Sequence, residues 1–135
     1  MIKNISNLGD AALYCDFGTE VNKETNSTVI KYFRSVKKKE IQGIINLTPS
    51  YNKLIISFDL KKTHFKEIKK KIENLDVTDT ISEFSKKIEI PICCTDDFSL
   101  DIKRLEEKLS LKREKIYENF FNKEYFCYMT GFIAG

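Results

Sequence analysis

Cysteine and histidine are the residues in this sequence that could bind a metal or act as nucleophiles, and their spacing argues against both roles. The four cysteines, Cys15, Cys93, Cys94 and Cys127, lack the C-x-x-C spacing that lets two thiolates reach one metal ion. The single histidine, His64, has no identifiable carboxylate neighbour, so we interpret it as a surface residue. We therefore predict no metal site and free thiols in a reducing compartment.

The glycines and lysines form no familiar nucleotide-binding motif. The five glycines are far apart, and the sequence contains no P-loop, no G-x-G-x-x-G and no G-x-S-x-G. Two lysine clusters, residues 37–39 and 69–71, would form either a phosphate-binding patch or solvated helix faces. Because acidic residues are interleaved with them and the net charge is only +3, we predict no nucleic-acid partner. The carboxylate pairs at residues 96–97 and 106–107 are interpreted as surface groups, since the fold, not sequence adjacency, assembles catalytic pairs.

The apolar periodicity predicts the elements that would have to position any site. Apolar runs bounded by turn residues predict strands at residues 2–5, 11–17, 41–47 and 54–60. Helical spacing of apolar residues predicts helices at residues 25–38 and 65–75. The order ββαββα is typical of a two-layer α+β domain with both helices on one face of an antiparallel sheet. The expected core residues are Phe33, Val36, Ile45, Phe58, Ile68 and Ile72.

The weak periodicity of residues 76–87 predicts a boundary between two parts, residues 1–80 and 81–135. The second part should contain a strand at residues 88–94, helices around residues 102–109 and 113–122, and a strand at residues 125–133. The last strand is apolar on both faces, so we expect a second copy of the chain to cover it. The sequence shows no membrane span and no secretory signal, which predicts a cytoplasmic protein with no membrane partner.

Four stretches carry a resemblance to a known family. They are Gly9-Asp10-Ala11-Ala12-Leu13 with Phe17-Gly18; Pro49-Ser50-Tyr51 leading to Phe58-Asp59; Ile90-Pro91-Ile92-Cys93 with Asp101-Ile102; and Glu124-Tyr125 through Tyr128-Met129, Gly131-Phe132 and Gly135. In order and approximate spacing they resemble the family of the 5-oxoprolinase B subunit, allophanate hydrolase subunit 1 and the kinase inhibitor KipI. The resemblance implies a ββαββα N-terminal domain followed by the opening strand, helix and strand of a truncated cyclophilin-like β-barrel, the start of a carboxyltransferase C/D domain.

The same resemblance implies an activity and a site. The activity is ATP-dependent opening of a cyclic amide, 5-oxoproline to glutamate, in a complex with a homologue of the C subunit and with the lactam-handling A subunit. ATP is the implied cofactor, and this component by itself would be inactive. The glycine-rich C-terminal stretch implies ligand contacts by Tyr128, Gly131, Phe132 and Gly135, because glycines let backbone N–H groups approach a ligand closely. No catalytic residue is assigned.

Two other functions stay open. A KipI-like protein would be a non-enzymatic inhibitor that binds a sensor histidine kinase. A truncated interaction module is favoured by Ala134, which stands where the family usually has proline, by Phe120, which stands where histidine is common, and by the early end of the sequence. Cys94 is a further departure, at a position where tyrosine is usual. Phenylalanine cannot transfer a proton as histidine does, and alanine lacks the fixed φ of proline.

Overall fold

The computed structural model describes residues 1–77 and 87–131. Those residues fall into two compact units, the first containing residues 1–77 and 128–131 and the second containing residues 87–127. The boundary predicted near residue 80 lies outside the described residues.

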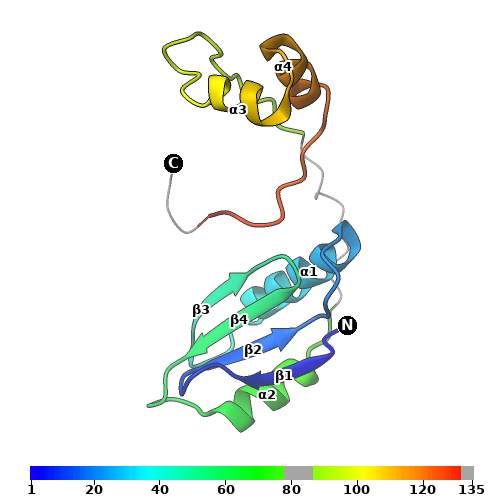
Figure 1. Ribbon diagram of the computed structural model, residues 1–135. Coiled ribbons are helices and arrows are strands. Elements are labelled where there is room, and N and C mark those ends of the chain that lie inside the picture. The colour runs from blue at the N-terminus through cyan, green and yellow to red at the C-terminus, as the bar shows by residue number, and fades with distance from the viewer. Residues whose placement is uncertain (78–86, 132–135) are drawn as a thin grey trace. The chain divides into compact units, whose positions relative to one another are not determined.

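A four-stranded antiparallel sheet forms the first unit, with the strand order β1-β2-β4-β3 (Figure 1). The strands are β1 (Asn4–Asn7), β2 (Ala12–Asp16), β3 (Ile44–Pro49) and β4 (Lys53–Phe58). Every second residue of β2 and β4 is buried, because successive side chains of a strand point to opposite faces. One face of the sheet therefore supplies the core.

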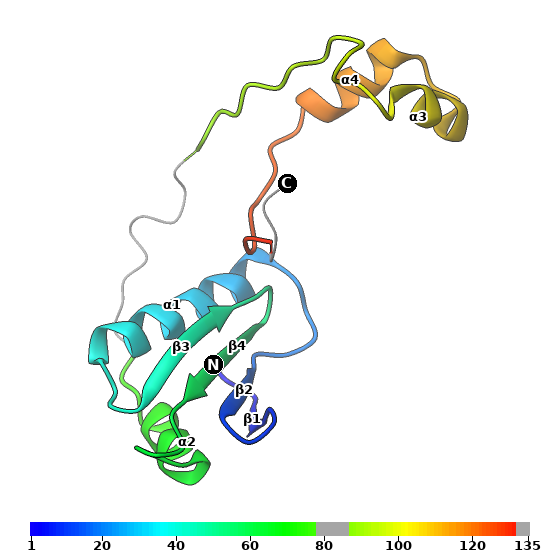
Figure 2. The same cartoon turned by 90° about the vertical axis from the view of Figure 1, so that its left-hand side faces the viewer.

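Two helices, α1 (Lys23–Lys39) and α2 (Phe65–Glu73), cover that face of the sheet (Figure 2). The Asn22 side chain accepts a hydrogen bond from the Thr25 N–H at 2.8 Å and caps the start of α1. His64 caps α2 in the same way, because its Nδ1 accepts the N–H of Glu67 at 3.2 Å. The only histidine of the sequence thus has a structural role. The predicted ββαββα order is confirmed, and the fold is α+β.

Most of the predicted core is present. Four of the predicted residues are at most 1% exposed: Val36, Phe58, Ile68 and Ile72. Phe33 is half-buried and packs against them. Their helical or alternating spacing was sufficient to identify them, because burial in these elements follows the local period.

The prediction for Ile45 is wrong, since its side chain is 68% exposed. In the sheet register, Ile44 pairs with Phe58 and Asn46 pairs with Ser57, so Ile45 has no partner on β4. This is a β-bulge, in which one extra residue interrupts the alternation of side chains. An interpretation that assumes strict alternation therefore places Ile45 incorrectly.

The second unit contains α3 (Ile102–Leu109) and α4 (Arg113–Phe121), close to the predicted helices. The two helices contact one another, and Glu106 Oε1 accepts the N–H of Arg113 at 2.9 Å at the start of α4. Ser99 Oγ and the Tyr117 hydroxyl lie 2.8 Å apart and connect the preceding turn to α4. An Arg113–Asp96 ion pair joins the same two segments.

The two strands predicted for this part of the chain are absent from its described residues. Residues 88–94 and 125–131 belong to no strand, whereas residues 132–133 lie outside the described range. A strand exists only where a neighbouring strand exchanges backbone hydrogen bonds with it, and no such pairing occurs within residues 87–131. High apolar and β-branched content was therefore insufficient to predict these two elements.

Candidate functional site

Two of the predicted ligand-binding residues, Tyr128 and Gly131, lie in a segment that belongs to the first unit. The Tyr128 ring is half-buried and meets the ring of Tyr51 edge to face, with centroids 6.0 Å apart. Tyr51 lies in the turn between β3 and β4, so this turn and residues 128–131 form one end of the unit. Phe132 and Gly135, the other two predicted residues, lie outside the described chain.

A buried amide on α1 holds this end together. Asn26 is only 3% exposed, and its Nδ2 lies 3.1 Å from each of three backbone carbonyl oxygens, those of Ser50, Tyr51 and Tyr128. An amide nitrogen has two N–H donors, so the three acceptors share them. Asn26 was not identified from the sequence. The sequence does contain a sign of its role, because Asn26 lies three positions before Val29 and therefore on the apolar stripe of the helix. A polar side chain that is buried there needs hydrogen-bond partners.

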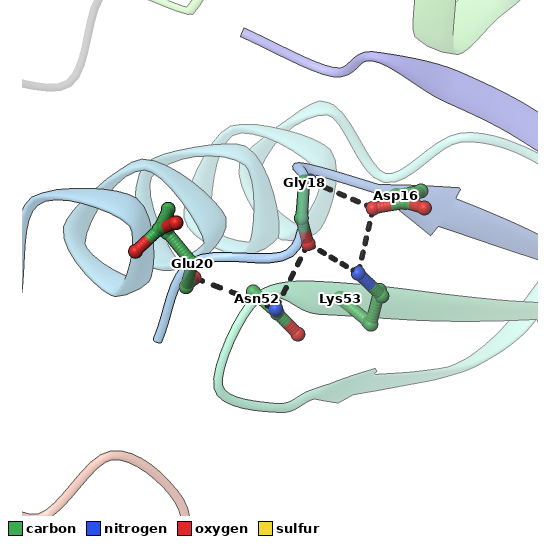
Figure 3. Close-up of polar contacts among 5 residues, drawn as sticks. All are labelled: Asp16, Gly18, Glu20, Asn52 and Lys53. Carbon is green, nitrogen blue, oxygen red and sulfur yellow. Dashed lines mark hydrogen bonds and ion pairs between the residues drawn. The ribbon is translucent and has the colours of Figure 1, made fainter. Parts of the chain in front are cut away.

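An ionic network lies where β2 ends and β4 begins (Figure 3). Asp16 Oδ1 accepts hydrogen bonds from the Gly18 N–H at 2.7 Å and from Lys53 Nζ at 2.6 Å. Lys53 also donates to the Gly18 carbonyl at 2.5 Å, and Asn52 Nδ2 donates to the same oxygen at 2.8 Å. The cross-strand register sets Asp16 opposite Lys53, which no sequence spacing could indicate.

This network fixes the charge of Asp16. The hydrogen bond from Lys53, followed in strength by that from the Gly18 N–H, lowers the pKa of the Asp16 carboxyl below its usual value. The ammonium of Lys53 donates hydrogen bonds to the Asp16 carboxylate and to the Gly18 carbonyl, so these two donors are used within the protein. Both groups therefore serve the structure of the loop that follows β2.

A small pocket of about 260 Å³ lies beside the network. Its lining includes the N-terminal residue Met1 and the charged side chains of Lys3, Glu20 and Glu24. Each of the two carboxylates would repel a phosphate group placed there. Among residues 1–77 and 87–131, no group of three His, Cys, Asp or Glu side chains could hold a metal ion.

The described thiols differ in their environment. Burial raises the pKa of Cys15 to about 12, so this side chain stays a neutral core thiol. Hydrogen bonds from the backbone and then the hydroxyl of Thr95 lower the pKa of the exposed Cys93. Neither thiol lies in an assembled cluster of metal-binding side chains within the described residues.

None of the helices in the described part of the chain is long and apolar enough to cross a membrane. The longest, α1, has 17 residues and ends in three lysines.

The α+β fold and the sequence together define the class of protein. The chain belongs to the family described as the carboxyltransferase domain, subdomain C and D, which matches residues 3–135. A relative among characterised proteins is the 5-oxoprolinase B subunit of Bacillus subtilis (strain 168), which is 24% identical over 143 aligned residues. The match covers 97% of this chain and 60% of the relative, so the chain spans about three-fifths of that protein.

Two solved structures show the same fold. The conserved uncharacterized protein PH0987 from Pyrococcus horikoshii aligns with a TM-score of 0.52 and 23% identity, covering 89% of this chain and 56% of its own. TTHA0988 aligns with a TM-score of 0.65 and 18% identity, covering 80% of this chain and 21% of its own. The family resemblance read from the sequence is confirmed.

Proposed function

We propose that this chain acts as the B subunit of a 5-oxoprolinase, one component of an ATP-dependent hydrolase that opens 5-oxoproline to glutamate. The observation that carries the proposal is the match to a 5-oxoprolinase B subunit along 97% of this chain. Its partners would be a homologue of the C subunit and the lactam-handling A subunit. The isolated chain would not turn over the substrate.

The lactam would be contacted by Tyr128, Gly131, Phe132 and Gly135. Hydrolysis of the ring adds water across the amide C–N bond and develops negative charge on the carbonyl oxygen. Backbone N–H groups aimed at that oxygen would stabilise the charge, and glycine allows the backbone to approach closely. The Asn26 amide supports this assignment, because it holds the carbonyl of Tyr128 against α1 and so positions the start of the segment.

The Asp16–Lys53 network and the small pocket beside it are poorly suited to the phosphate groups of ATP. The ammonium of Lys53 is bound to Asp16, and the pocket beside it contains Glu20 and Glu24. Phosphate groups need several free donors or cations around them. The nucleotide would therefore be bound mainly by groups from the partner subunits.

Lactam-dependent phosphate release tests the proposal. The natural full-length protein is mixed with the C-subunit homologue, the lactam-handling partner and ATP. We expect phosphate release only in the complete mixture with 5-oxoproline, and none from the 135-residue chain alone. Within the mixture, Gly131→Val should lower the rate, while Thr130→Val, a change at the neighbouring exposed position, should leave it unchanged. A complete mixture that stays silent with both 5-oxoproline and allophanate would contradict the proposal and favour a kinase-inhibitor role.

A further inference from the structure

A groove lies between the C-terminal half of α1 and strand β3. Its volume is about 590 Å³, and its rim carries Lys37, Glu40 and Lys62. Its volume is sufficient for an apolar side chain, and Tyr128 and Gly131 are not among its lining residues. Its apolar walls are Phe33, Val36, Ile41, Ile44, Ile45 and Leu47.

The wall formed by β3 is an edge of the sheet, because β4 is its one neighbour among the described strands (Figure 2). Ser50 donates its N–H to the Lys53 carbonyl at 2.9 Å and so faces β4. Backbone groups alternate in direction along a strand, so Leu47 directs its N–H and C=O away from β4. Natural edge strands are protected by charged side chains, proline or bulges; β3 has no charged side chain, but it has a bulge at Ile45 and a proline at Pro49. This edge is able to accept an additional strand.

Two features limit how much chain can pair there. The bulge at Ile45 interrupts the regular ladder, and Pro49 has no backbone N–H. Only the short stretch between them can exchange backbone hydrogen bonds with a neighbour. Because continuous pairing between the edges of two copies is interrupted at both ends, the occupant that fits is a short extended segment rather than a second sheet.

The charge of the rim indicates the composition of that segment. No carboxylate of the described residues lies within ion-pair distance of Lys37 or Lys62. Lys38 and Lys39 add two further charges in the last turn of α1. Glu40 is the single acidic residue of the described lining. The surface around the groove is therefore basic, and it complements acidic side chains.

We propose that this groove binds a short, extended, acidic segment of a partner protein, which adds to β3 as a fifth strand. An apolar side chain of the segment enters between α1 and β3, and an acidic one lies beside Lys37 and Lys62. Backbone pairing supplies affinity, while the groove and the lysines supply specificity, as in other strand-addition sites. The inference does not depend on the proposed hydrolase function.

Peptide binding tests the inference. The probe is a fluorescein-labelled hexapeptide of alternating valine and glutamate, titrated with the 135-residue chain and followed by fluorescence polarisation. We expect saturable binding, with amide shifts in ¹⁵N NMR spectra concentrated in residues 41–48. Two control peptides should each bind at least about tenfold more weakly. One has lysine in place of glutamate, and the other is N-methylated at alternate residues. Absence of binding by the glutamate peptide, or equal binding by the other two, overturns the proposal.

Matched substitutions locate the site. Ile45→Asp and Lys62→Glu should each weaken binding by about tenfold. Their controls are Leu60→Asp and Lys66→Glu, which change exposed residues outside the groove and should leave binding unchanged. Because the Ile45 side chain is 68% exposed, Ile45→Asp should keep the wild-type thermal midpoint. An oligothymidylate or anionic lipid vesicles should not displace the labelled peptide. If either displaces it as well as the unlabelled peptide does, the lysines form a general anion-binding surface, and the proposal of a protein-binding groove is rejected.

Discussion

The Asn26 side chain ties both the β3–β4 turn and Tyr128 to α1. Asn26→Leu should lower the free energy of unfolding by about 1–3 kcal/mol, because it removes a buried donor from three part-buried carbonyl groups. Urea unfolding measures this change. Asn46→Ala is the matched control, since the amide of Asn46 is exposed and donates to the Thr48 hydroxyl on the same strand. An equal loss of unfolding free energy in both variants would contradict the structural role assigned to the Asn26 hydrogen bonds.

The Asp16 carboxylate should make stability depend on pH. Its pKa is lowered in the folded state, chiefly by Lys53, so its stabilising effect is fully present above the unfolded pKa of about 4. That effect is lost as the pH falls through the lower folded pKa. The difference in unfolding free energy between the wild type and Asp16→Asn should therefore be largest near pH 7 and should shrink below about pH 4.

Among the elements, β4 contributes most clearly to the core of the first unit. Phe58→Ala should cost about 3–5 kcal/mol, because the residue is 1% exposed and its removal leaves a cavity. Phe33→Ala on α1 should cost less, since that ring is only half-buried at the edge of the groove. Ile45→Ala should change the unfolding midpoint very little. A midpoint unaffected by Phe58→Ala would reject the proposed core.

At the scale of the whole molecule, the second unit exposes large apolar side chains, among them Ile88, Ile90 and Phe98 at 71–75%. Apolar exposure of this extent promotes association. We expect sedimentation of the 135-residue chain to show a dimer or a larger species, and Ile90→Lys to shift it toward monomer. Leu60→Lys, which changes an exposed residue of the first unit, should not. A monomer at high concentration would contradict this expectation.

Tyr128→Lys is expected to act differently from Ile90→Lys. The sequence pattern placed Tyr128 in a strand that would pair between chains, but the ring packs against Tyr51 within the first unit. Lysine at this position should therefore lower the stability of the first unit more than it changes the association state. Thermal unfolding and sedimentation of the same variant separate the two effects. A variant that becomes monomeric while keeping the wild-type thermal midpoint would instead support pairing between chains.

The sequence by itself determined the elements whose periods are local. Helical spacing over residues 25–38 predicted α1 with Val36 in its buried stripe, and the apolar run at residues 54–60 predicted β4 with Phe58 in the core. These patterns depend only on residues a few positions apart, because helices and strands have fixed periods of 3.6 and 2. The family followed from short motifs in order along the chain, which also need no knowledge of contacts.

Only the tertiary structure decided the features that depend on distant partners. The bulge that exposes Ile45 is a property of pairing with β4, and the ion pair of Asp16 with Lys53 depends on the register of β2 against that strand. Asn26 meets the carbonyl of Tyr128 across 102 positions of sequence. Apolar residues at 88–94 could not form a strand without a neighbour. Such contacts are selected by the packing of the whole chain, so no local pattern in the sequence specifies them.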